Sequence, residues 1–204
     1  LLVTFDAGRP WEIDPDSLEV KTPVGSYEDW RIGLPPTIIP GPFKPIFSTA
    51  HPAFDQREGH LWTAAYGLDL GGAGAGFLEL LRWDGEGQIA NWEVVDAETG
   101  DNVTITQSMH SLGVSKNWVL VCDTAFLIEF EQTLDQEKSR AHSPETTLWA
   151  ISKVGLESSG GQAPAIKVVL PGAVAHFLVD YEDAEGVVIH AAHNNASDAS
   201  EWIR

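Results

Sequence analysis

Three histidines stand in separate phrases of the chain, each reading as a strand or a turn: His51 in STAHPAFD, His110 in QSMHSLGVSKNW and His176 in AVAHFLVDYED. Neutral imidazole is a common protein ligand for iron and zinc, and it leaves the ion's charge available to activate a bound molecule. Because the three residues are far apart in the chain, the fold and not a local loop would have to bring them together. Isolated histidines also occur as ordinary core or surface residues, so these residues alone leave a metal centre and a structural role both open.

The elements that must position these histidines read as β-strands. Short runs rich in Val, Ile, Leu and Trp alternate with turn signals, for example at 77–83, 117–131, 146–154, 165–172 and 186–194. WDGEGQI and DAETGDNV, between such runs, are typical of hairpin turns. No segment keeps a helical hydrophobic period long enough to predict a helix. The sequence therefore predicts an all-β fold of antiparallel strands, and its repeating strand groups with tryptophans favour β-propeller blades over a single sandwich.

Two segments interrupt the strand pattern. The prolines at 31–47, in LPPTIIPGPFKPIF, lack the donor that a strand ladder needs, so we expect a rigid proline-rich connector over the surface or across a site entrance. GLDLGGAGAGF lacks the Lys-Ser/Thr that completes a phosphate-binding loop, and it predicts a flexible hairpin tip. We expect residues 1–204 to form one partial β-propeller domain.

Composition restricts the classes of protein and partner. The chain has 204 residues, 43% of them hydrophobic and 21% charged, which is typical of a soluble globular protein. Its formal net charge of −18 opposes binding to a polyphosphate backbone, so we expect no nucleic acid partner. No apolar run is long enough to span a bilayer. We expect a cytoplasmic protein, in which the proline-rich connector either packs or supplies a patch for peripheral membrane contact.

Other chemistries find little support in the sequence. No GxSxG motif is present, which excludes the usual serine hydrolase arrangement. No two glutamates are spaced for acid and base work near a nucleophile. Cys122 is the single cysteine and lies in an apolar run, which predicts a buried, inert thiol. We therefore expect no catalytic residue beyond a metal site.

The three histidine phrases together resemble the carotenoid cleavage oxygenase family. STAHPAFDQREGHLW is similar to its first histidine motif, and SMHSLGVSKNWVLVCDTAF is similar to its second. HFLVDYED resembles the third, with Tyr181, Glu182 and Asp183 matching the tail of that motif. The order and spacing agree along essentially all 204 residues, as part of a longer family chain.

The resemblance implies part of a seven-bladed β-propeller, with the first and last blades incomplete or missing. In this family a nonheme Fe(II) ion lies on the propeller axis, held by four histidines. The resemblance assigns three of these to His51, His110 and His176, and it places the fourth outside this chain. It implies a dioxygenase that cleaves a conjugated carbon-carbon double bond of a carotenoid or apocarotenoid with O2, giving carbonyl products. The implied partners are an apolar polyene and O2, and no oligomeric state is indicated.

Two residues near the start of the chain acquire roles through the same resemblance. A family carboxylate that orients the second histidine aligns with Asp6, although a turn aspartate beside Gly8 is an equal alternative. Stilbene-cleaving relatives carry a lysine just before that acid, where this chain has Phe5. Phenylalanine cannot hydrogen-bond a phenol, so Phe5 favours a polyene and is a candidate for the substrate tunnel, or else an ordinary core residue.

The chain departs from the family pattern at two places, and other functions are compatible with its sequence. His190 and His193 are the only histidines after the third motif, and their three-residue spacing on a strand prevents both from reaching one metal ion. Val179 and Asp180 stand where the third motif has asparagine and alanine, and Asp180 either bonds to a neighbouring strand or faces solvent. The chain could also be a propeller that binds an apolar ligand or a partner without turnover, or a stilbene-cleaving relative.

Overall fold

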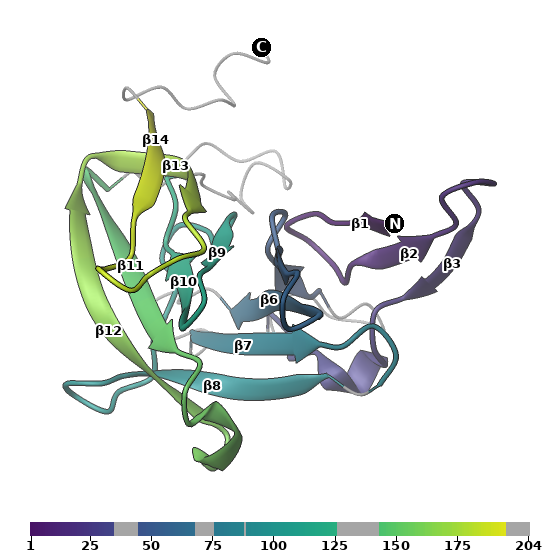
Figure 1. Cartoon of the computed structure of the whole chain (residues 1–204), viewed down its shortest axis with the longest axis horizontal. Coiled ribbons are helices and arrows are strands. Elements are labelled where there is room, and N and C mark those ends of the chain that lie inside the picture. The colour runs from purple at the N-terminus through teal and green to yellow at the C-terminus, as the bar shows by residue number, and fades with distance from the viewer. Residues whose placement is uncertain (35–44, 68–75, 88, 126–142, 195–204) are drawn as a thin grey trace.

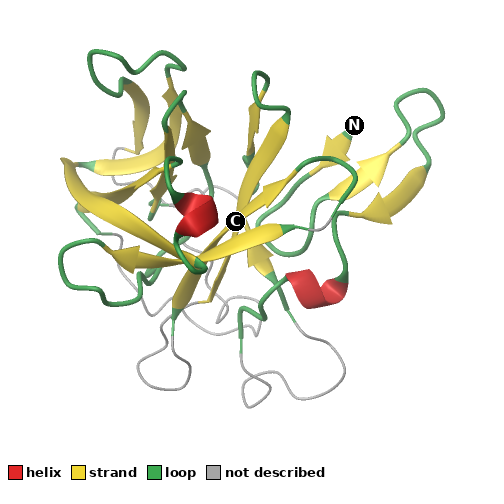
Figure 2. Cartoon of the chain, turned by 60° about the horizontal axis from the view of Figure 1, so that its bottom comes forward, coloured by secondary structure: helices red, strands yellow, loops and turns green. Residues whose placement is uncertain are grey.

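The computed structural model describes residues 1–34, 45–67, 76–87, 89–125 and 143–194. Strands dominate these residues, together with two single-turn 3-10 helices, η1 (Tyr27–Asp29) and η2 (Leu156–Ser158) (Figure 2). The strands are β1 (Leu2–Val3), β2 (Trp11–Ile13), β3 (Val20–Pro23), β4 (Phe47–Ser48), β5 (Ala53–Asp55), β6 (His60–Gly67), β7 (Phe77–Trp83), β8 (Ala90–Asp96), β9 (Leu112–Val114), β10 (Trp118–Cys122), β11 (Glu145–Ser152), β12 (Gln162–Pro171), β13 (Ala173–Val179) and β14 (Ile189–Asn194). The expectation of strands without long helices is confirmed for the described residues.

The strands form three sheets. A nine-stranded sheet runs in the order β4-β6-β7-β8-β12-β11-β10-β9, with β5 also paired to β6. β1, β2 and β3 form a small sheet that projects to one side, and β13 and β14 form a hairpin against β9, β10 and β11 (Figure 1). The long sheet curls, so its two ends face each other (Figure 1). The fold is all-β and is part of a β-propeller.

One strand pair departs from the predicted antiparallel blades. Residues 165–171 of β12 pair antiparallel with β11, whereas residues 162–165 pair parallel with β8. β8 and β12 are the last strands of two successive antiparallel groups, so they run in the same direction where the groups meet. The ten-residue length of β12 lets one strand serve both neighbours and joins two blades into one sheet.

The core explains why the apolar runs become strands. Buried side chains of both blades form the main cluster, in which Trp62 and Trp92 stack at 6.0 Å between ring centroids. A separate cluster joins Leu120 and Leu148 of the long sheet to Val174 and Phe177 of β13. The apolar contacts of this second cluster seat the β13–β14 hairpin on the sheet.

Other sequence predictions meet the structure in different ways. Cys122 is 1% exposed, which confirms the prediction of a buried thiol, and its burial raises the pKa of the thiol to about 12. Residues 35–44 of the proline-rich connector at 31–47 and most of GLDLGGAGAGF lie outside the described residues. In the part of the chain that is described, no helix has the length and apolar character of a membrane span.

Candidate metal centre

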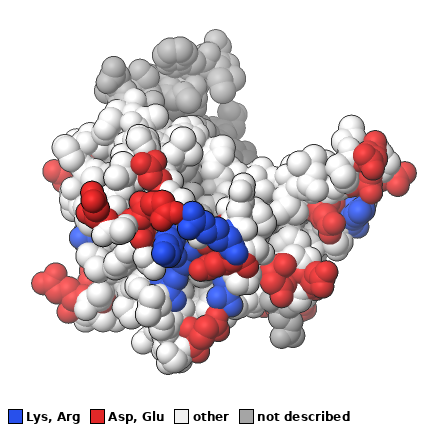
Figure 3. Space-filling model, viewed as in Figure 1, with Lys and Arg blue, Asp and Glu red and all other residues white. Residues whose placement is uncertain are grey.

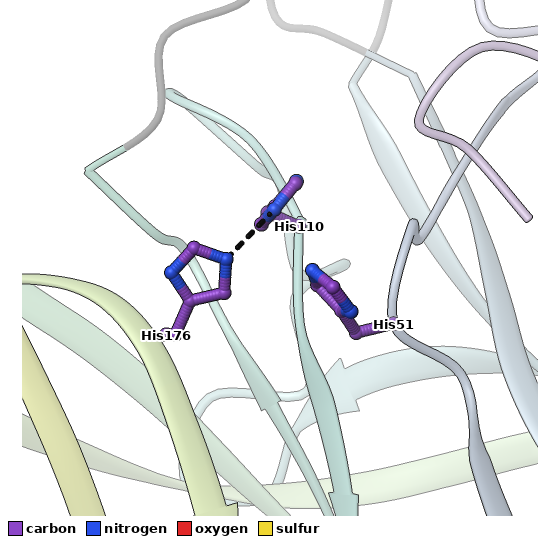
Figure 4. A group of neighbouring side chains, drawn as sticks. All are labelled: His51, His110 and His176. Carbon is purple, nitrogen blue, oxygen red and sulfur yellow. Dashed lines mark hydrogen bonds between the residues drawn. The ribbon is translucent and has the colours of Figure 1, made fainter. Parts of the chain in front are cut away.

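His51, His110 and His176 converge, although they come from three different parts of the fold (Figure 4). His51 lies between β4 and β5, His110 lies just before β9, and His176 lies on β13. Their ring centroids are 4.7, 4.8 and 5.1 Å apart, and each ring meets the others edge to face. Three ligand nitrogens, one from each imidazole, therefore lie in one small space. No other described His, Cys, Asp or Glu joins this group.

The nitrogen spacing fits a single metal ion. Nε2 of His110 and Nε2 of His176 are 3.1 Å apart, and the ligand nitrogens of the three rings all lie within 4.8 Å of one another. Nitrogens bound about 2.1 Å from one ion would be about 3.0 Å apart at a right angle and about 4.2 Å apart on opposite sides. The residues therefore fit a metal ion in number and ligand type, and the group is slightly wider than one ligand shell. Binding of an ion would draw the rings inward.

Backbone contacts tie the first two histidines directly together. The backbone N–H of His51 donates to the carbonyl of His110 at 3.1 Å, and the N–H of Leu112 donates to the carbonyl of His51 at 3.1 Å. The Thr49 hydroxyl also donates to the His110 carbonyl, at 2.8 Å. These hydrogen bonds fix the spacing of two candidate ligands independently of any ion.

A buried carboxylate shapes the loop that leads to His110. Asp123 accepts hydrogen bonds from the backbone N–H groups of Thr106, Gln107 and Ser108 and from the Thr106 hydroxyl. The hydroxyl of the next residue, Thr124, accepts the backbone N–H of His110 at 3.2 Å. The two residues that follow β10 therefore fix the 106–110 loop, and with it the backbone position of His110.

Asp6 lies where the resemblance places the orienting carboxylate. Both of its carboxylate oxygens are 2.9 Å from Nδ1 of His110. The Asp6 carbonyl accepts the N–H of Ser48, and the Thr4 hydroxyl donates to the Ala50 carbonyl, so this segment is fastened along 48–50. A carboxylate at Nδ1 keeps the ring proton there and leaves Nε2 free of it. Nε2 of His110 then accepts the hydrogen bond from Nε2–H of His176, and a bound ion would replace that proton.

Replacing Asp6 by alanine is expected to weaken metal binding by about 10- to 100-fold, because groups that orient metal-binding histidines have effects of that size. Without the carboxylate, His110 can carry its proton on either ring nitrogen. The affinity for Fe(II), titrated without oxygen, measures the effect. Asp16→Ala is the control, since Asp16 is exposed on the neighbouring β2–β3 turn. Equal affinities for the two variants would show that Asp6 does not orient His110.

The rings of His51 and His176 are prepared to act as neutral ligands. Partial burial lowers the pKa of both imidazoles below the ordinary value, because it disfavours the charged form of the ring. A neutral ring keeps a lone pair for an ion, whereas a protonated ring does not. Both side chains remain solvent-accessible, so an ion can reach them.

A cavity of about 1120 Å³ opens onto His51 and His176. Apolar side chains supply much of its wall; they are Leu2, Ala53, Phe54, Leu61, Leu112, Val114, Phe177, Leu178 and Val179. Gln56, Arg57, Tyr181 and His190 add polar groups. The cavity therefore joins an apolar chamber to the candidate metal ligands, which is the usual character of a small-molecule site.

Phe5 does not line this cavity. Leu2 and Thr4 line the cavity, whereas the Phe5 side chain does not and is 42% exposed. Its ring covers Gly8, where a Cβ atom would lie 2.5 Å from the ring. Phe5 is therefore not among the residues that line this cavity, and its place in a substrate tunnel stays a prediction.

The later histidines occupy different sites. His190 lies across from Leu178 on the cavity side of the hairpin, and its Nε2 is 2.9 Å from Oδ1 of Asp180. Asp180 thus bonds to the neighbouring strand, one of its two predicted alternatives. His193 lies beside Gly172, and neither histidine joins the three-histidine group.

Sequence reasoning missed several polar side chains that hold the site together. The sequence assigns Tyr181 and Asp183 only to the tail of the third motif. In the structure, both bond to other histidine-bearing segments. Thr49 and Thr124 received no role although each bonds to the backbone of His110. Their positions in the sequence could have indicated these roles, because each is a polar residue close to a candidate ligand or at the end of an apolar strand.

The fold and this site define a class: a β-propeller protein with a candidate metal centre made of histidines alone. The chain belongs to the family described as Retinal pigment epithelial membrane protein, whose model matches residues 1–203. This match, with the structural neighbours, confirms the resemblance to carotenoid cleavage oxygenases.

Solved structures show the same fold at low sequence identity. The lignostilbene dioxygenase of Pseudomonas brassicacearum is 14% identical with a TM-score of 0.58, over 98% of this chain and 38% of that one. A variant of the Synechocystis apocarotenoid oxygenase is 13% identical with a TM-score of 0.57, over 97% of this chain and 39% of that one. The chain thus spans well under half the length of these proteins. A search of curated proteins found no match.

Proposed function

We propose that this chain is part of a nonheme iron(II)-dependent dioxygenase that cleaves a conjugated carbon-carbon double bond of a carotenoid or apocarotenoid. The observation that carries the proposal is the meeting of His51, His110 and His176 beside an apolar cavity. Family membership supports the same chemistry. The proposed partners are an apolar polyene and dioxygen, and the proposed products are two carbonyl compounds.

The three histidines would hold the ion through ring nitrogens, and Asp6 would keep the His110 proton on Nδ1. Nitrogen ligands suit iron and do not favour magnesium or calcium, which prefer oxygen. Ferrous iron bound there would supply binding and activation of dioxygen. Because all three ligands are neutral, the protein would leave the charge of the ion undiminished.

The cavity wall would select the substrate. Phe54, Leu178 and their apolar neighbours offer dispersion contacts to a polyene and no hydrogen bonds along its length. Such a wall excludes water from the chain of double bonds and holds one bond beside the histidines. The polar groups Arg57 and Tyr181 lie at the same cavity and could face a polar end of the substrate.

Anaerobic titration of the full-length protein with Fe(II), followed by oxygen and an apocarotenal, tests the proposal. We expect about one tightly bound iron per protein and two carbonyl products, both absent when iron is omitted. A hydroxystilbene tested in parallel separates the two substrate classes of the structural neighbours. Iron binding without products from either substrate would instead support a propeller that binds without turnover. Failure to bind iron would refute the metal centre itself.

A further inference from the structure

Beyond the histidines, the three histidine-bearing segments meet a second time. Each segment carries, a few residues after its histidine, a polar side chain that bonds to another of the segments. We call this set the collar; its members are Asp55, Ser115, Asn117, Tyr181 and Asp183. The collar joins residues that are up to 126 positions apart in the chain.

Asp183 makes the link between the third segment and the second. Its carboxylate accepts the Ser115 hydroxyl at 2.7 Å, the Asn117 backbone N–H at 2.8 Å and the Asn117 side-chain amide at 2.7 Å. A neighbouring backbone bond, from the N–H of Lys116 to the carbonyl of Tyr181, runs between the same two segments at 2.8 Å. Asp183 is 8% exposed, so water competes little for these bonds.

Tyr181 makes the link between the third segment and the first. Its hydroxyl donates to Asp55 at 3.1 Å. Asp55 lies four residues after His51 in the chain. Asp55 is fully buried and is itself fixed by an ion pair with Lys153 and by the backbone N–H of Arg57. The tyrosine therefore bonds to a rigid acceptor.

The β13–β14 hairpin needs such links because its strands pair only with each other among the described strands. Apolar contacts seat it, with Phe177 in the core and Val179 lying over Gly113. Hydrogen bonds from the Ala125 N–H to the Val174 carbonyl at 2.9 Å and from the Val174 N–H to the Thr146 hydroxyl at 2.8 Å fix the start of β13, two residues before His176. The hydrogen bonds of Tyr181 and Asp183 fix the chain beyond the other end of β13.

We propose that Tyr181 and Asp183 are positioning residues for His176. They fasten the end of β13 to the segments of His51 and His110, so that the His176 ring is held against the other two. The inference rests on the proposed metal centre. It explains how the β13–β14 hairpin, which is separate from the long sheet, can hold His176 in the correct position. The tail of the third motif thus serves the ligand that precedes it.

Co²⁺ is the probe for the test, because its visible absorption reports both affinity and ligand geometry. We expect Asp183→Ala in the full-length protein to weaken Co²⁺ binding about tenfold, the lower end of the effect of groups that orient ligands, and to change the spectrum. Asp183→Asn should rescue most of the affinity. The new amide oxygen still accepts from Ser115, and the Asn117 side-chain amide can rotate so that its oxygen accepts from the new amide N–H. Tyr181→Phe should weaken binding less, in the same direction.

Asp180→Ala is the matched control. Asp180 lies three residues earlier and bonds to His190 within the hairpin, not to another segment. If the parent binds Co²⁺ and the Asp183→Ala and Asp180→Ala variants match it in affinity and spectrum, the positioning role is refuted while the metal centre stands. If Asp183→Ala does not fold, Tyr181→Phe decides in the same way. A parent protein that binds no Co²⁺ overturns the metal centre and this inference together.

Discussion

Replacing His176 by alanine is expected to reduce Fe(II) affinity by more than about 100-fold, beyond the range for residues that merely orient ligands. His176 supplies one of the three converging rings among the described residues, and its Nε2 is 3.1 Å from that of His110. Without it, this chain would offer an ion two nitrogens, those of His51 and His110. Anaerobic titration with Fe(II) and the metal content after dialysis measure the loss.

His193→Ala is the control for this substitution, because His193 is an exposed histidine of the same hairpin. It lies beside Gly172 and outside the three-histidine group, so its removal should leave affinity at the parental value. Should the two variants bind iron equally well, His176 would not be a ligand. The oxygenase proposal would then lose its principal support.

Replacing Asp123 by alanine is expected to destabilise the protein by about 3–5 kcal/mol, because four donors, two of them buried backbone N–H groups, would lose their acceptor at once. These donors are the N–H groups of three consecutive residues and one hydroxyl, all in the loop before His110. Burial raises the pKa of Asp123, and its four hydrogen bonds act in the opposite direction. Urea unfolding measures the change in the free energy of unfolding.

Asp96→Ala provides the comparison. Asp96 accepts the backbone N–H groups of Glu98 and Thr99 in an exposed turn, so water can replace it as the acceptor. We expect this variant to lose no more than about 1 kcal/mol. Equal losses for the two variants would mean that the 106–110 loop does not depend on Asp123.

Much of the fold could be predicted because strand formation is local. The apolar runs predicted at 77–83, 117–131 and 146–154 overlap β7, β10 and β11, and residues 126–131 of the second run lie outside the described residues. Alternation within such a run decides which side chains are buried, and the turn residues between runs decide where a strand ends. The parallel pairing of β8 with β12 could not be predicted, since it depends on how two completed blades meet.

The close packing of the β13 side chains against the backbone of β9 also could not be predicted from the sequence. At Gly113 an added Cβ would lie 2.3 Å from Val179 and 2.9 Å from Phe177, so β9 accepts the hairpin only because that residue has no side chain. In the sequence this glycine is one of many. Phe5 shows the same limit, because the sequence does not indicate that its neighbour Thr4 lines the cavity while Phe5 packs over Gly8.

For the candidate site, the sequence by itself determined the residue types, the order of the three histidine phrases and, through resemblance, the family. Only the tertiary structure decided that the three rings meet, that Asp6 reaches His110, and that Tyr181 and Asp183 fasten the third segment. The physical reason is that local chain geometry sets which way a side chain leaves its own strand. Contacts between residues far apart in the chain depend on how blades and hairpin pack, which no local pattern specifies.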